Sequence, residues 1–144
     1  MLDLEIVRLD SELPLPTYSR AGDAGLDLIA RVDATVPRAG GRILVPTGIA
    51  VAIPPGYAGF VVPRSGLALK QGLTVANSPG LIDSGYRNEV QVVLLNTDPH
   101  GTAQVRRGDR IAQLVLVAIE EARLVVVDSF DGDHRGGGFG STGR

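Results

Sequence analysis

The chain has 144 residues, a formal net charge of −2 and no cysteine or tryptophan, and its length is typical of one compact domain. Its 19 glycines and 9 prolines argue against a helical bundle, because both residue types break helix interiors. A hydrophobic content of 44% is enough to fill a core, and with three Phe and three Tyr that core must consist of Val, Ile, Leu and Ala. We therefore predict an all-β fold.

The same counts exclude several classes of function. Without cysteine there is no disulfide, thiolate metal site or cysteine nucleophile. A charge near zero argues against nucleic-acid binding, which needs a basic face. The acidic residues Asp3 and Glu5 argue against a secretory signal, and the longest apolar run, residues 114–119, is too short to span a bilayer. We expect a cytoplasmic protein that binds neither nucleic acid nor membranes.

Short apolar runs separated by turn formers predict a series of strands. We expect strands at residues 4–9, 26–29, 41–45, 49–53, 57–63, 91–96, 110–119 and 124–127. This spacing is typical of a sandwich or barrel rather than of βαβ units. One short helix is predicted over 65–72, with Ser65 as N-cap and Gly72 at its end. We divide the chain into a β domain, 1–130, and a flexible glycine-rich arm, 131–144.

The arm contains GFGSTG at 138–143, which matches the GxGxxG dinucleotide fingerprint. That motif works between a strand and a helix, and no helix-forming stretch follows here, so a Rossmann site is rejected. Glycine N–H groups together with Ser141, Thr142 and Arg135 could still bind an anion. A disordered tail is the alternative, although Phe139 favours a segment that packs on something.

Residues 77–89 place several groups of possible catalytic use close together. Asp83 follows two apolar residues, so partial desolvation could tune it as a base. The alternative is an aspartate that opens a Ser-Gly turn. Asn77 offers one acceptor and two donors, which could read a base edge or cap a turn.

Three further segments carry polar groups, and each segment allows two interpretations. Arg64 and Ser65 before the predicted helix could bind a phosphate, or they could be a surface arginine and an ordinary cap. Gln113 interrupts an apolar strand, so it either faces solvent or serves a site. The carboxylates of Asp23 and Asp27 lie in a glycine-rich loop, where they could hold Mg²⁺ or simply be solvated.

Taken together and in order, five stretches resemble the five motifs of the trimeric deoxyuridine triphosphate nucleotidohydrolases (dUTPases), in particular the bacterial ones. The stretches are AGDAGLDL from Ala21, PRSGLA from Pro63, NSPGLIDSGYRNE from Asn77, RGDRIAQL from Arg107 and RGGGFGSTG from Arg135. The resemblance implies a jelly-roll (β-barrel-like, β-clip) subunit and a homotrimer with active sites at its subunit interfaces. It also implies Mg²⁺-dependent hydrolysis of dUTP to dUMP and pyrophosphate, which keeps uracil out of DNA and supplies dUMP for thymidylate synthesis.

The resemblance also implies a role for each matching residue. Asp83 would activate the water that attacks the α-phosphorus, and Tyr86 would pack under the deoxyribose and exclude a 2′-hydroxyl. Asp27 would reach Mg²⁺ through water. The uracil would be read by Asn77 with the hairpin residues Gly80 and Ile82, and the phosphates would be held by Arg64, Ser65, Gly66 and Gln113. From another subunit, the arm residues that close over the substrate would be Arg135, Gly138, Phe139, Gly140, Ser141 and Thr142.

One position departs from the family pattern, and two other functions compete. Asn88 stands where the family usually has glycine, and we expect a preserved turn because Asn tolerates the left-handed conformation. The related dCTP deaminases are one rival, but the hairpin around Asp83 and the arm with Phe139 favour the hydrolase. A catalytically idle nucleotide-binding module is the other, and hydrolysis of dUTP distinguishes it from an enzyme.

Overall fold

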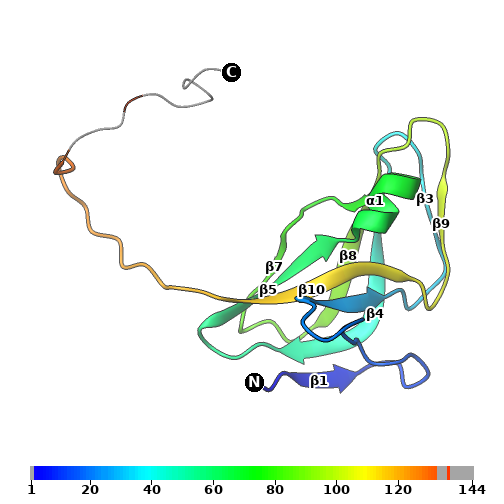
Figure 1. Ribbon diagram of the computed structural model, residues 1–144, viewed down its shortest axis with the longest axis horizontal. Coiled ribbons are helices and arrows are strands. Elements are labelled where there is room, and N and C mark those ends of the chain that lie inside the picture. The colour runs from blue at the N-terminus through cyan, green and yellow to red at the C-terminus, as the bar shows by residue number, and fades with distance from the viewer. Residues whose placement is uncertain (1, 133–135, 137–144) are drawn as a thin grey trace.

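Apolar residues in short runs between turns form two four-stranded antiparallel sheets and one two-stranded sheet in the computed structural model, which describes residues 2–132 and 136 (Figure 1). The elements are β1 (Glu5–Arg8), β2 (Gly25–Ile29), β3 (Ala34–Val36), β4 (Arg42–Ala52), β5 (Tyr57–Pro63), α1 (Ser65–Gln71), β6 (Leu73–Val75), β7 (Gly80–Ile82), β8 (Glu89–Asn96), β9 (Ala103–Val105) and β10 (Arg110–Ala118). One sheet has the order β1-β4-β8-β6, the second has the order β2-β10-β5-β7, and β3 pairs with β9.

The core is formed from both four-stranded sheets. In β8, every second residue is buried, from Val90 to Asn96, which is the pattern of a strand with one face on a core. Side chains of the second sheet, such as Leu28 and Leu114, join the same buried cluster. The buried apolar residues of the described chain are all Leu, Ile, Val or Ala. The predicted all-β fold with an aliphatic core is confirmed.

The strand β4 corrects one prediction. Two strands were expected, at 41–45 and 49–53, because Pro46 and Gly48 separate two apolar runs. The structure has a single strand that continues through both residues, and its pairing with β8 shifts register between Pro46 and Ala50. Proline and glycine are tolerated there because an irregular point of a ladder does not need every N–H group.

The predicted helix exists, but it begins differently. Arg64, not Ser65, is the N-cap residue, and its side chain makes no capping hydrogen bond. Gly72 ends the helix in the left-handed conformation, with φ of 64°, as expected of a glycine at this position. The helix therefore has seven residues, about two turns.

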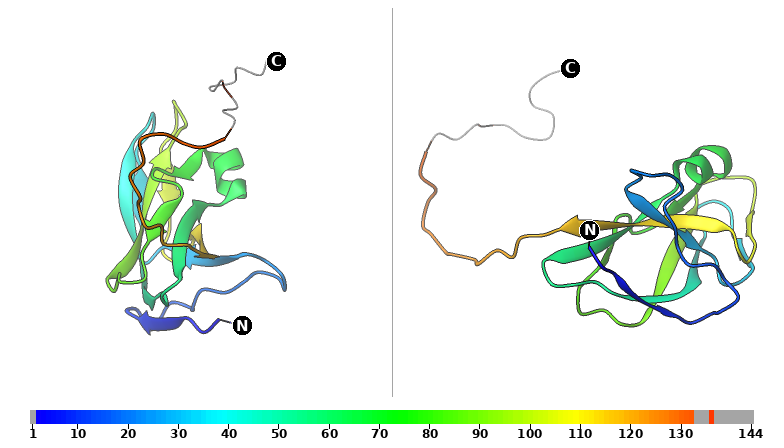
Figure 2. Two further views of the ribbon diagram at one scale, coloured as in Figure 1. Left: turned by 90° about the vertical axis from the view of Figure 1, so that its left-hand side faces the viewer. Right: turned by 60° about the horizontal axis from the view of Figure 1, so that its bottom comes forward.

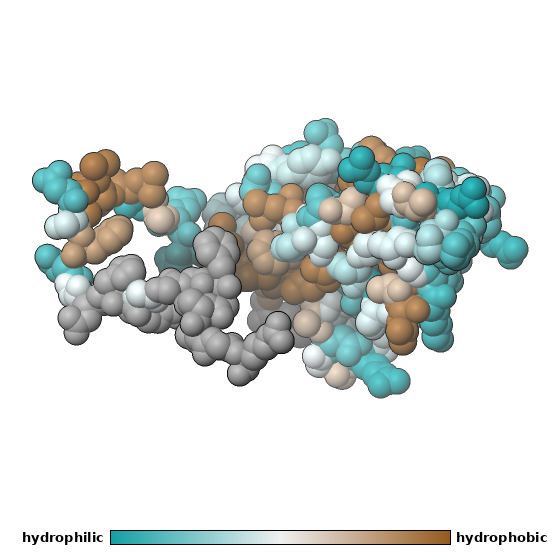
Figure 3. All heavy atoms as spheres, turned by 90° about the horizontal axis from the view of Figure 1, so that it is seen from above, coloured by the Kyte–Doolittle hydropathy of each residue, from teal (hydrophilic) through white to brown (hydrophobic). Residues whose placement is uncertain are grey.

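The predicted strand at 124–127 is wrong. After β10 the chain leaves the body as an extended segment without a strand partner (Figures 1 and 2). Leu124 and Val126 are 91% and 97% exposed, and apolar side chains of this segment stand clear of the body (Figure 3). An apolar run becomes a strand only where another strand accepts its backbone hydrogen bonds, and the described part of this chain offers none to it. The division at residue 130 stays a prediction.

Candidate active site

The sheet β2-β10-β5-β7 brings together segments that are far apart in the sequence. Asp27 on β2 pairs directly with Gln113 on β10. On the other side of β10, Ala112 pairs with Pro63, so Arg64 leaves β5 next to the same place. Three of the predicted polar residues thus meet because their strands are neighbours.

The carboxylate of Asp27 is the centre of this group, and only 4% of the residue is exposed. Arg64 Nε donates to Oδ1 and Arg110 Nη1 donates to Oδ2, both at 3.1 Å. Ser19 Oγ donates to Oδ2 at 2.9 Å, and Gln113 Nε2 lies 3.5 Å from Oδ1. Two guanidinium groups on one carboxylate leave an excess of positive charge. We call these five residues the anion cluster, because that excess suits a phosphate group.

Two members of the anion cluster were not predicted. Arg110 belongs to the RGDRIAQL stretch, and its place at the start of a predicted strand was the available signal. Ser19 carries no sequence signal, since a serine in a loop is common. Within the described residues, no group of three or more His, Asp or Glu side chains is arranged to hold a metal ion.

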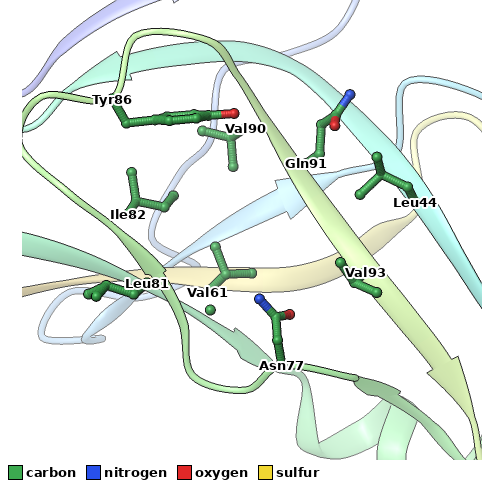
Figure 4. Close-up of a pocket in the computed structure, with 10 residues that line it drawn as sticks. Leu44, Val61, Asn77, Leu81, Ile82, Tyr86, Val90, Gln91 and Val93 are labelled. Carbon is green, nitrogen blue, oxygen red and sulfur yellow. The ribbon is translucent and has the colours of Figure 1, made fainter.

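A cavity of about 250 Å³ opens where β7 meets β8 (Figure 4). Four residues that were expected to contact the nucleoside line it, namely Asn77, Gly80, Ile82 and Tyr86. The other lining residues are Leu44, Val61, Leu81, Val90, Gln91 and Val93. In Figure 4 the Asn77 amide and the Tyr86 ring lie on opposite sides of the cavity. Most of the lining residues are of apolar types and three carry polar groups, a combination typical of a small-molecule site.

Local contacts fix two walls of this cavity. Tyr86 donates its hydroxyl to the Glu89 carbonyl at 2.9 Å and its N–H to the Asp83 carbonyl at 3.1 Å. Gly80 leaves room for Asn77, because a Cβ atom at Gly80 would lie 3.1 Å from Asn77 Nδ2. The Asn77 amide makes no hydrogen bond within the described residues, so its donors and acceptor face the cavity unpaired. The Ser78–Pro79 bond is cis.

Two expectations about the hairpin are corrected. Asp83 is exposed in this chain rather than partly desolvated, because the two apolar residues before it belong to β7 and the hairpin turns outward after them. Asn88 does not need the left-handed conformation, since Ala39 is the only non-glycine residue of the described chain with positive φ. The turn therefore accepts Asn88 without backbone strain.

The remaining predicted residues fall into two groups. Ser65 and Gly66 are exposed at the start of α1, and a Cβ atom at Gly66 would meet nothing within 4 Å. Six others lie outside the described residues: Arg135, Gly138, Phe139, Gly140, Ser141 and Thr142. The anion cluster contributes no residue to the lining of the cavity, so the described chain holds two separate parts of the predicted site.

A second cluster of charges lies at the loop before β2 and the turn before β10. Arg107 donates to both oxygens of Asp10, at 2.6 and 3.0 Å, and also contacts Glu12. Arg31 lies 3.4 Å from Asp10. The hydrogen bond from Arg107 is the main reason that the pKa of Asp10 is lowered to about 2.

The sequence relatives found by comparison with known proteins agree with one another. The dUTPase family profile matches residues 11–143. A deoxyuridine 5′-triphosphate nucleotidohydrolase of Thermobifida fusca (strain YX) is 56% identical over 141 residues, which cover 97% of this chain and 78% of that protein. Another from Mycobacterium sp. (strain JLS) is 53% identical over 146 residues, covering 97% and 94%.

Solved structures agree with the sequence comparison. A variant of the Staphylococcus bacteriophage 80alpha dUTPase with dUpNHpp has a TM-score of 0.89 at 25% identity, covering 99% of each chain. A variant of the phage phi11 dUTPase of S. aureus, described for its coordination of a structural Mg(II) ion, has a TM-score of 0.82 at 26% identity, covering 91% of this chain and 100% of that one. The resemblance and its bacterial type are confirmed, and so is the jelly-roll fold. The chain belongs to the dUTPase family.

Proposed function

We propose that this chain hydrolyses dUTP to dUMP and pyrophosphate. One observation carries the proposal: the sheet β2-β10-β5-β7 gathers an anion cluster near one end and forms, with β8, a nucleoside-sized cavity at its β7 edge. The curated relatives above are named for this activity. No helix in the described part of the chain is long and apolar enough to cross a membrane.

The cavity suits a pyrimidine deoxynucleoside. The unpaired Asn77 amide can donate to a carbonyl oxygen of uracil and accept from its ring N–H. Gly80 and Ile82 line the same cavity. Tyr86 offers a flat apolar ring on which a deoxyribose packs, and a ribose would bring its 2′-hydroxyl against that ring.

The phosphates would bind at the anion cluster, where Arg64 and Gln113 are joined by Arg110 and where Ser65 and Gly66 border open space. Mg²⁺ would neutralise charge on the triphosphate and orient it. The described residues fit a metal that arrives on the triphosphate rather than one held by a protein cage. Asp27 would contact it through water, since the 3.5 Å contact from Gln113 is weak enough for such a water to replace.

The chemical step needs one base and a well-positioned water. Asp83 would take a proton from the water while the water oxygen bonds to the α-phosphorus. The bond from the α-phosphorus to the oxygen bridging to the β-phosphate then breaks, and that oxygen leaves with pyrophosphate. Such reactions depend on positioning and charge stabilisation more than on covalent chemistry, which suits a site rich in donors.

A homotrimer with sites at its subunit interfaces would join the two separate parts of the site. The exposed apolar side chains of Leu124, Val125, Val126 and Phe130 support this, because such a segment is stabilised when it packs on another subunit. The arm beyond it would then reach a neighbouring active site, with Phe139 stacking on uracil and Arg135, Ser141 and Thr142 meeting the γ-phosphate.

The direct test is pyrophosphate release with Mg²⁺ from dUTP, beside dTTP, dCTP and UTP. We expect release from dUTP alone, because the proposed contacts do not suit the 4-amino group of dCTP or the 2′-hydroxyl of UTP and would leave no room for the 5-methyl group of dTTP. Ammonia from dCTP would move the chain to the deaminase class. Folded protein that is inactive with all four would be a binding module.

A further inference from the structure

Glu89, the first residue of β8, connects the edge of the cavity to the neighbouring strand, β4. Its side chain is only 19% exposed. Oε1 accepts a hydrogen bond from the N–H of Gly48 on β4 at 2.8 Å. Gly48 has a φ of +75° and lies where the register between β4 and β8 shifts. The carboxylate therefore satisfies a backbone donor at an irregular point of the ladder, and this bond fixes how β8 begins.

Arg31 holds the same carboxylate from a second direction. Its Nη1 lies 3.3 and 3.4 Å from the two oxygens of Glu89. Arg31 is itself anchored, because its N–H donates to the Pro46 carbonyl at 2.8 Å and Nη2 donates to the Leu9 carbonyl at 3.2 Å. The Arg31 guanidinium is thus held by Leu9 and Asp10 as well as by Glu89, which restricts the side chain of Glu89.

The backbone of Glu89 contacts the cavity wall. Its carbonyl accepts the hydroxyl of Tyr86 at 2.9 Å, and the next residue, Val90, also lines the cavity. Tyr86 is 36% exposed, so packing alone does not determine the direction of its ring. The hydroxyl bond ties the ring to the carbonyl, and the residue that carries this carbonyl is held on β4 by its pairing with Ala50 and by its carboxylate.

We propose that Glu89 is a positioning residue for sugar selection, which holds Tyr86 at the distance that admits deoxyribose and rejects ribose. The inference rests on the proposed function, in which Tyr86 excludes the 2′-hydroxyl. If Glu89 loses its hold on β4, the ring can retreat and UTP gains access. The preference for dUTP over UTP then falls while turnover of dUTP changes much less.

Three substitutions separate the reach of this side chain from its charge. Glu89→Asp keeps the charge but is shorter by one methylene, about 1.5 Å, and cannot reach Gly48. Glu89→Gln keeps an acceptor for Gly48 but loses the charge, and Glu89→Ala loses both. We expect the ratio of kcat/KM for dUTP to that for UTP to fall about tenfold for Asp and Ala, and to stay near the original value for Gln.

The matched control is Glu12→Gln, since Glu12 belongs to the neighbouring charge cluster but its side chain is 86% exposed and, among the described residues, is bonded to Arg107 alone. Its ratio should not change. In a Tyr86→Phe background, which lacks the hydroxyl, Glu89→Asp should add no further loss of sugar preference. Should Glu89→Ala fail to fold, the comparison of Asp with Gln decides.

An unchanged ratio in Glu89→Asp overturns the inference. So does an equal fall in kcat/KM for both nucleotides accompanied by a lower unfolding temperature, because that is the signature of a purely structural role. If the unsubstituted protein does not hydrolyse dUTP, the proposed function fails first, and the two failures are told apart by that measurement.

Discussion

At the scale of single residues, Asp83, the proposed base, has an ordinary environment in the isolated chain. It is exposed and makes no side-chain hydrogen bond within the described residues, so the environment of a base would be completed by bound nucleotide. We expect Asp83→Asn to slow turnover by about 10²- to 10⁴-fold, because the amide cannot take a proton from the water. Binding of dUpNHpp, measured by calorimetry, should stay nearly unchanged.

The control for this substitution is Asp3→Asn, which removes one exposed carboxylate far along the chain from the hairpin. Its turnover should equal that of the unsubstituted protein. Undiminished pyrophosphate release from Asp83→Asn would assign the base to another residue.

The close packing at Gly80 leads to a second prediction at this scale. Its missing side chain leaves space for Asn77, and a Cβ atom would stand 3.1 Å from Asn77 Nδ2 and 3.4 Å from Val61 Cβ. Gly80→Ala should push the amide out of position and raise KM for dUTP about tenfold, equivalent to about 1.4 kcal/mol, with a smaller change in kcat. Steady-state kinetics check this. In Gly85→Ala, where a Cβ meets nothing within 4 Å, KM should stay the same, and equal values for both variants would contradict the steric argument.

At the scale of elements, the cluster of Asp10 and Arg107 fastens the loop before β2 to the turn before β10. The pKa of Asp10 in the folded chain, about 2, lies below the unfolded value of 3.8. A depressed pKa stabilises the fold above pH 4 or so, and this contribution is lost as the pH falls from there toward about 2.

Asp10→Asn should therefore lower the urea midpoint at pH 7 and leave it almost unchanged at pH 2, so that the acid limb of the stability curve becomes flatter. Unfolding followed by circular dichroism across this range measures the effect. Asp3→Asn serves as the control, with a curve that follows the unsubstituted protein. A uniform downward shift at every pH would show that Asp10 acts by packing rather than by its charge.

The elements also show what sequence can and cannot predict. β8 and β10 were predictable because long runs of apolar residues repeat along them. β3, β6 and β9 have three residues each, too few to show a period, and they exist because a partner strand lies beside them. The run at 124–127 has the composition of a strand but no partner strand among the described residues, so composition alone was misleading there.

The order of the five sequence motifs identified more residues of the candidate site than the chemistry of single residues did. Asp27, Arg64 and Gln113 were predicted, and the strand pairing explains why they meet. Ser19 was not singled out, and for Glu89, the last residue of the NSPGLIDSGYRNE stretch, the contacts could not be predicted, because they depend on the loop path and on the register shift in β4. Long-range contacts of this kind leave no local pattern in the sequence.

At the scale of the whole molecule, the last strand of the described chain ends before the arm begins. β10 ends at Ala118, and the N–H of Ile119 donates to the Gly56 carbonyl at 3.0 Å. Deletion of residues 136–144 should change the unfolding temperature by about a degree at most, as a substitution on the protein surface does. The same deletion should abolish most dUTP hydrolysis, because the proposed site needs the arm. Calorimetry beside pyrophosphate release checks both halves. Full activity of the shortened chain would show that the arm has no part in the reaction.

For the proposed homotrimer, mixing two inactive chains decides whether the arm serves its own subunit or a neighbour. One chain carries Asp83→Asn and the other lacks residues 136–144. If each site takes its arm from its own subunit, no site in a mixed trimer has both an intact Asp83 and an arm. If the arm comes from a neighbour, about a quarter of the sites in randomly mixed trimers have both.

We therefore expect that co-refolding the two chains at equal amounts restores about a quarter of the activity of the unsubstituted protein. Mixing them without unfolding should restore none until subunits exchange. Continued inactivity after co-refolding, with trimers present by light scattering, would assign the arm to its own subunit.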